Sequence, residues 1–174
     1  MSDKRAMLTA AFRDRQVANR AYAWLQDHGY SSNDISVLMS DSTRDYYTKE
    51  QSEGRLEPGS LANEGVAAGG AVGTAVGATL GAILAIGTTV LVPGIGWVAG
   101  PIIAALAGGG AGAVTGGSIG GLIGLGISEP NAKAYEASLR NGGVVYGVVP
   151  RSAEDAKVIR KYFEDNKADN IINA

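Results

Sequence analysis

The stretch "MLTAAFRDRQVANRAYAWLQDHGYSSNDISVLMS", residues 7–40, predicts a strand, a helix and a second strand. The apolar runs "MLTAAF" and "ISVLMS" at its two ends are typical of buried strands. Between them, Val17, Ala21 and Leu25 recur at helical spacing, with Asp14 placed as an N-cap and Gly29 as a left-handed stop. We therefore expect a βαβ unit whose two strands run parallel.

The C-terminal end of the chain repeats this plan. "VVYGVV" at 144–149 predicts a strand, Ser152 caps a helix, and "NIIN" at 170–173 predicts a last strand. Residues in the two predicted helices match at a shift of 138 positions: Ala18 with Ala156, Trp24 with Tyr162, and Leu25 with Phe163. The similarity suggests two related halves. A further helix, capped by Ser128 and ended by Gly142, precedes the second half.

Two βαβ halves that share one sheet predict an α/β (α+β) fold, a ferredoxin-like four-stranded sandwich with helices on one face. We assign residues 1–40 and 128–174 together to this domain. The other face of the sheet needs a cover, either the glycine-rich insertion or a second subunit. The alternating and helical patterns predict this core: Leu8, Ala10, Phe12, Val17, Ala21, Trp24, Ile35, Val37, Val145, Ile159 and Phe163.

Residues 41–64 have the composition of a polar linker. The segment "DSTRDYYTKEQSEGRLEPGS" at 41–60 mixes both charge signs with Gly and Pro and lacks a sustained apolar face. One short helix fits around 45–53. Tyr46 and Tyr47 could mark a docking segment, but we favour a plain solvated linker.

Residues 65–127 contain no Asp, Glu, Lys, Arg or His. Small residues recur at every fourth position before and after a break at "VPGIGWVAGP", residues 92–101. Such stripes let two helices approach closely, so we expect arms at 65–91 and 98–127 to form an antiparallel glycine-zipper hairpin. The residues predicted to carry this packing and assembly are Gly69, Gly73, Gly77, Gly81, Gly108, Gly112, Gly116, Gly120 and Gly124.

The surroundings of this hairpin remain open between three alternatives. Each arm, at about 40 Å, is long enough to cross a bilayer, and the larger apolar residues gather toward the tip. Membrane insertion is favoured, followed by burial in a soluble oligomer and then by folding onto the chain's own sheet. A lone soluble monomer would expose too much apolar surface. The expected partners are therefore other copies of the chain and a lipid bilayer.

The chain resembles the bacterial heat-induced or general stress protein family, the 17M-like group. Three segments carry the resemblance: "FRDRQVANRAYAWLQDHGYSSNDISVLMS", "VPGIGWVAGPIIAALAG" and "GLGISEPNAKAYEASLRNGGVVYGV". The resemblance implies a stress-linked protein of undefined biochemistry, and it brings no catalytic residues. The last segment follows the family pattern at Gly126, Ile127, Glu129, Ala132, Tyr135, Glu136, Leu139, Gly142 and Gly143.

Composition argues against several classes of function. The net charge of −2 without a basic cluster excludes a nucleic-acid footprint, and the absence of cysteine excludes disulfides. His28, the only histidine, is explained by its place near a helix C-terminus, and no phosphate-loop or metal-ligand spacing is present. We therefore expect no enzyme activity, no cofactor and no metal.

Two classes of function remain. The first is a non-enzymatic general-stress protein that associates with membranes or with itself through the hairpin, in the cytoplasm at the inner membrane's cytoplasmic face. The alternative is a soluble oligomeric α/β ligand-binding or sensor module, with a pocket between sheet and hairpin. The sequence identifies no ligand.

Overall fold

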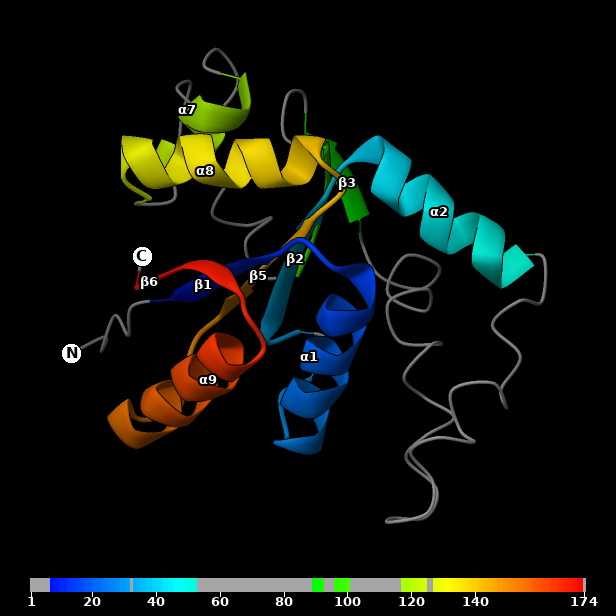
Figure 1. Cartoon of the computed structure of the whole chain (residues 1–174). Coiled ribbons are helices and arrows are strands. Elements are labelled where there is room, and N and C mark those ends of the chain that lie inside the picture. The colour runs from blue at the N-terminus through cyan, green and yellow to red at the C-terminus, as the bar shows by residue number, and fades with distance from the viewer. Residues whose placement is uncertain are drawn as a thin grey trace.

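The structure is a computed structural model that describes residues 7–31, 33–52, 89–92, 96–100, 117–124 and 127–173 of the 174-residue chain. Within these residues the chain forms strands and helices in the order shown in Figure 1. They are β1 (Leu8–Phe12), α1 (Arg15–Asp27), β2 (Ile35–Met39), α2 (Asp41–Ser52), β3 (Thr89–Val92), β4 (Gly96–Ala99), α7 (Gly117–Gly124), α8 (Glu129–Arg140), β5 (Val144–Val148), α9 (Ala153–Asp165) and β6 (Asp169–Asn173).

The described strands form one sheet, in the order β3-β4-β2-β5-β1-β6. Every pair of neighbours is antiparallel. β1 and β2 both run antiparallel to β5, so they run parallel to each other, as the βαβ pattern predicts. Tyr146 of β5 is paired with Ala10 on one side and Val37 on the other. Strands from both ends of the chain therefore share the centre of one sheet.

Helices lie on both faces of the sheet. α1 and α9 cover one face, and α8 with α7 covers the other (Figure 1). Adjacent strand residues face opposite helical layers: Ala10 packs toward α1 and α9, whereas Ala11 packs toward α8. The sequence predicted helices on one face only, but the structure has a second core on the other face. This second core contains Ala11, Leu38, Val98, Leu122, Ile127, Ala132, Tyr135, Leu139 and Val145.

The core predicted from the sequence agrees well with the observed burial. All of its members except Val145 belong to the first core, which lies between the sheet and the helices α1 and α9. Nine of the eleven predicted residues are buried, and only Val17 and Trp24 remain partly exposed. The helix caps also follow the sequence: Asp14 accepts a hydrogen bond from the Gln16 backbone N–H at 2.7 Å, and Ser152 accepts one from Asp155 at 3.0 Å. Gly29 has the expected positive φ, +83°. Ser128 precedes α8 but makes no side-chain cap bond.

The expected helical hairpin is wrong at its tip. Thr89–Val92 and Gly96–Ala99 are strands, and β4 pairs with β2 at the side of the sheet. β-branched residues favour strands there, and Gly100 allows the backbones to approach, since a Cβ on it would lie 2.2 Å from the Ile35 carbonyl oxygen. In the rest of the two predicted arms, Gly117–Gly124 forms the short helix α7, and residues 65–88, 101–116 and 125–126 lie outside the described residues.

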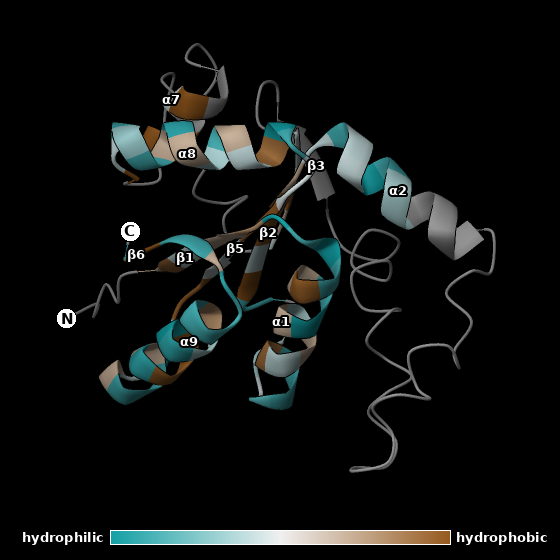
Figure 2. Ribbon diagram, viewed as in Figure 1, coloured by the Kyte–Doolittle hydropathy of each residue, from teal (hydrophilic) through white to brown (hydrophobic). Residues whose placement is uncertain are grey.

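The short helix expected around 45–53 in the linker is present as α2, but it begins earlier and packs on the domain. α2 covers Asp41–Ser52, and Tyr47 on it is buried in the first core. The Tyr47 hydroxyl donates to the Arg15 carbonyl at 3.5 Å, and the Arg44 guanidinium lies 3.8 Å from the centre of the Trp97 ring. The first turns of α2 are mainly hydrophilic (Figure 2), and Asp41, Ser42 and Asp45 on them are exposed. Residues 53–64 lie outside the described part.

Candidate functional site

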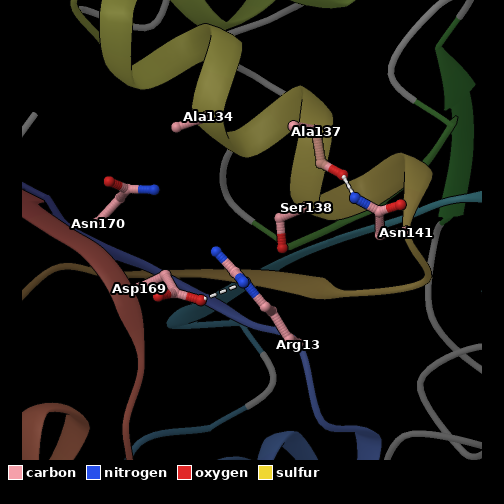
Figure 3. Close-up of a pocket in the computed structure, with 7 residues that line it drawn as sticks. All are labelled: Arg13, Ala134, Ala137, Ser138, Asn141, Asp169 and Asn170. Atoms are coloured by element: carbon pink, nitrogen blue, oxygen red, sulfur yellow. Dashed lines mark hydrogen bonds and ion pairs between the residues drawn. The ribbon is translucent and has the colours of Figure 1, made fainter.

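A pocket of about 390 Å³ lies between α8, β6 and the turn that follows β1 (Figure 3). Its volume falls in the range of small-molecule sites. α8 contributes one wall, β6 contributes another, and Arg13 enters from the end of β1. The described residues that line the pocket are Arg13, Ala134, Ala137, Ser138, Asn141, Asp169 and Asn170.

One ion pair lies in this pocket. Arg13 Nε is 2.7 Å from Asp169 Oδ2, with side chains 76% and 38% exposed. The pairing of β1 with β6 brings the two residues together, because Ala11 lies opposite Asp169. A pair as exposed as this adds little to folding stability. Its main effect is to orient the guanidinium, whose terminal end points into the space beneath α8 (Figure 3).

Ser138 places a buried hydroxyl at the pocket. The residue is only 7% exposed, and its Oγ has no hydrogen-bond partner among the described residues. Serine inside a helix usually bonds to the carbonyl four residues earlier or points to water. Gly143 leaves room for this side chain, because a Cβ there would lie 2.4 Å from Ser138 Oγ. A buried hydroxyl without a partner destabilises a fold by about 1–3 kcal/mol, which a bound polar group would relieve.

Tyr135 fixes the β6 side of the pocket. Its hydroxyl donates to the Asn170 carbonyl and accepts from the Thr9 hydroxyl at 2.9 Å. Burial raises the pKa of Tyr135 to about 12, so the donor is retained throughout the neutral range. Asn170 has a positive φ of +50°, a conformation that Asn tolerates better than most residues. The amide of Asn170 is thereby held at the pocket (Figure 3).

Asn141 completes the wall at the C-terminal end of α8. Its Nδ2 donates at 2.8 Å to the Ala137 carbonyl, which also accepts the Asn141 backbone N–H at 3.2 Å at this helix end. The side-chain oxygen of Asn141 is therefore the atom left for a ligand, and it acts as an acceptor. Between the polar groups, Ala134 and Ala137 supply a small apolar surface.

The predicted assembly glycines are only partly described. Gly120 and Gly124 lie in α7, which packs on α8 with Leu122 fully buried. Their role in a zipper stays a prediction. The other residues of the set lie outside the described part of the chain: Gly69, Gly73, Gly77, Gly81, Gly108, Gly112 and Gly116.

Neither His28 nor a cluster of metal-ligating side chains forms a second site among the described residues. His28 caps the end of α1, with Nδ1 2.8 Å from the Trp24 carbonyl and its ring against the indole. No group of three potential metal-ligating side chains occurs among the described residues. In the same residues, no helix is both long and apolar enough to cross a bilayer.

Sequence reasoning missed the pocket. Arg13 and Asp169 look like ordinary surface charges until the β1–β6 pairing joins them. One signal was present in α8: Ser138 falls on the same side as Tyr135 and Leu139, where an apolar residue would be expected. A serine on a buried helical face is a reason to look for its partner.

Comparisons with protein-family models, with curated proteins and with solved structures found no match to this chain. The resemblance to general stress proteins therefore stays an expectation from the sequence.

Proposed function

We propose that this protein is a non-enzymatic α/β module that binds a small polar ligand in the pocket between α8 and β6. The buried Ser138 hydroxyl, which lacks a partner among the described residues and lies at the pocket, carries the proposal. A ligand there would contact groups from α8, from β6 and from the end of β1. A bound ligand would thus connect α8, β6 and the end of β1, as the function of a stress-responsive sensor requires.

Binding fits this pocket better than catalysis. The described lining residues include no His, Cys or Lys, and Asp169 is engaged by Arg13. Ser138 therefore has no general base beside it that would activate its hydroxyl as a nucleophile. The chemistry that remains is hydrogen bonding and charge pairing to a ligand.

The test is a thermal-shift screen of small polar compounds against the full chain. We expect compounds that raise Tm for the natural chain and raise it less for Ser138→Ala. Ser128→Ala is the matched control, because Ser128 is an exposed serine beside the same helix. A screen without stabilising compounds, or hits that Ser138→Ala binds equally well, would exclude this pocket as the functional site.

We also infer that the four strands β1, β2, β5 and β6 form a ferredoxin-like unit. The chain order β1-α1-β2 and β5-α9-β6, together with the sheet order β2-β5-β1-β6, supports this assignment. β3, β4 and α8 are then additions, at one edge and on the second face. An experimental structure with a different strand order would overturn it.

A second candidate function is self-association, with or without a membrane, through residues 65–127. The complete lack of charged residues there favours it, and so do the small residues at every fourth position. If lipid takes part, the α/β domain lies on the cytoplasmic side, since Arg55 and Lys133 flank the segment. The general stress function implied by the family resemblance fits either arrangement.

Mass measurement in detergent-free buffer tests this second candidate. We expect species larger than a monomer, and we expect Gly77→Leu or Gly112→Leu to disrupt them through overpacking. Carbonate and detergent washes of cell fractions then separate lipid insertion from a soluble oligomer. A monodisperse monomer at micromolar concentration would contradict self-association.

A further inference from the structure

We propose that the ligand of this pocket is a small zwitterion with a carboxylate and an ammonium group, the chemistry of a free amino acid. This inference rests on the proposed function. Arg13 and Asp169 are the only charged residues among the described residues that line the pocket, and they carry opposite charges side by side. A ligand with one charge of each sign can satisfy both.

The ion pair between Arg13 and Asp169 leaves other polar atoms of both side chains available to a ligand. Arg13 bonds to Asp169 through Nε, so the edge of the guanidinium formed by its two terminal nitrogens remains to take a carboxylate. Asp169 uses Oδ2, and its other oxygen can accept from an ammonium group. Carboxylate and ammonium groups on one carbon lie as close together as these two protein charges do.

The same pair disfavours ligands with a single charge. A simple anion drawn to Arg13 also meets the Asp169 carboxylate, and a simple cation drawn to Asp169 meets the Arg13 guanidinium. Each would gain one attraction and suffer one repulsion. A zwitterion in the matching orientation gains both attractions.

Ser138 and two alanines fit the same orientation. The Ser138 hydroxyl, on the α8 side above Arg13, is enclosed behind the pocket surface, and a rotation of this side chain would let it donate to the ligand carboxylate (Figure 3). Ala134 and Ala137 leave an apolar wall suited to a short aliphatic side chain.

The test compares four probes of nearly equal size: free alanine, propionate, ethylamine and propane-1,2-diol. Each is titrated into the full chain while the backbone amide signals of Ser138 and Asn170 are followed by NMR. We expect alanine to bind at least about tenfold more tightly than the other three, because only alanine makes both charge-assisted contacts.

Variants with altered charge give a second readout, the preference between alanine and propionate, which a loss of stability alone would not change. Asp169→Asn should reverse the preference, so that propionate binds at least as well as alanine. Arg13→Gln should weaken alanine about tenfold or more, and Arg13→Lys, which keeps the charge, should retain part of the affinity. Arg140→Gln is the control, because Arg140 makes an exposed pair with Glu136 outside the pocket lining.

The outcomes separate this inference from the proposed function. Propionate, ethylamine or the diol binding to the natural chain as tightly as alanine would overturn the zwitterion while leaving a ligand pocket in place. Unchanged signals at Ser138 and Asn170 with all four probes, while other polar compounds do shift them, would have the same meaning. No response to any polar compound would reject the pocket and the zwitterion together.

Discussion

The indole of Trp24 stacks on the ring of Tyr162, with centroids 4.0 Å apart and planes inclined by 10°. The two residues occupy matching positions in α1 and α9, and the next residue in each helix, Leu25 or Phe163, is fully buried. The match between the two halves of the sequence is thus also a direct contact between their helices. It joins α1 to α9 on one face of the sheet (Figure 1).

Trp24→Ala and Tyr162→Ala should each lower the free energy of unfolding by about 2 kcal/mol, less than for a fully buried aromatic residue. Their effects should not add, because an aromatic pair contributes about 0.5–1.5 kcal/mol of coupling. Urea denaturation of both single variants and the double variant measures this coupling. Val158→Ala, at a residue of α9 that is 49% exposed, is the control and should change little. Strictly additive effects would contradict an energetic role for the stack.

Gly100→Ala should release the β3–β4 strands from the sheet. Gly100 has a φ of +88°, and a Cβ on it would lie 2.2 Å from the Ile35 carbonyl oxygen, so we expect a loss of about 3 kcal/mol. Gly29→Ala separates the two causes: φ is +83°, but its closest neighbour is the flexible Arg151 side chain. Hydrogen exchange should then show β4 amides exposed in Gly100→Ala and protected in Gly29→Ala. Equal protection in both variants would contradict the close approach.

The same glycines explain where sequence reasoning about the fold succeeded and failed. The outer βαβ patterns carried enough local information, in caps such as Asp14 and in the spacing of apolar residues, to place the six elements β1, α1, β2, β5, α9 and β6. From Gly100 onward, the four-residue spacing of small residues indicated a helix, and Gly96 was expected in the break between the two helices. The pairing with β2 decides otherwise, and it is a contact between residues far apart in the sequence.

The candidate site was less accessible to sequence reasoning, because it depends on register. Arg13 and Asp169 meet only because β6 pairs with β1, with a shift of register between Thr9 and Ala11 of β1. No periodic pattern encodes such a pairing. Ser138 was the one local sign, since its polar side chain interrupts a buried helical face.

Alkaline pH should unfold the protein through its buried tyrosines. Burial raises the pKa of Tyr22 and of Tyr135 from the ordinary 10.0 to about 12, and that of Tyr146 well above its usual range. The folded state holds these protons more tightly than the unfolded state, so their contribution is complete below pH 10 and is lost as pH rises from 10 to 12. Tyrosinate absorbance and circular dichroism should change together over that range.

Tyr135→Phe tests one member of this group. It removes a group that ionises only when the fold opens, so the decline in stability between pH 10 and pH 12 should become shallower. At neutral pH the variant should be about 1–2 kcal/mol less stable, because the Asn170 carbonyl loses its donor. Denaturation curves at several pH values measure both effects. A pH dependence parallel to that of the natural chain would show that Tyr135 ionises without unfolding.

Ser138→Ala should make the ligand-free protein more stable, by about 1–3 kcal/mol. Serine and alanine differ here by one buried hydroxyl that has no partner among the described residues, so its removal abolishes a desolvation penalty and breaks no described bond. Urea denaturation measures the difference, and Ser128→Ala, which removes the exposed acceptor of the Asn131 side-chain amide at 2.9 Å, should change stability in the opposite direction. The gain in stability should accompany a loss of ligand affinity, as is common where a binding site holds an unsatisfied group. A destabilised Ser138→Ala would instead show that the hydroxyl already has a partner within the protein, and that the pocket does not depend on a ligand to satisfy it.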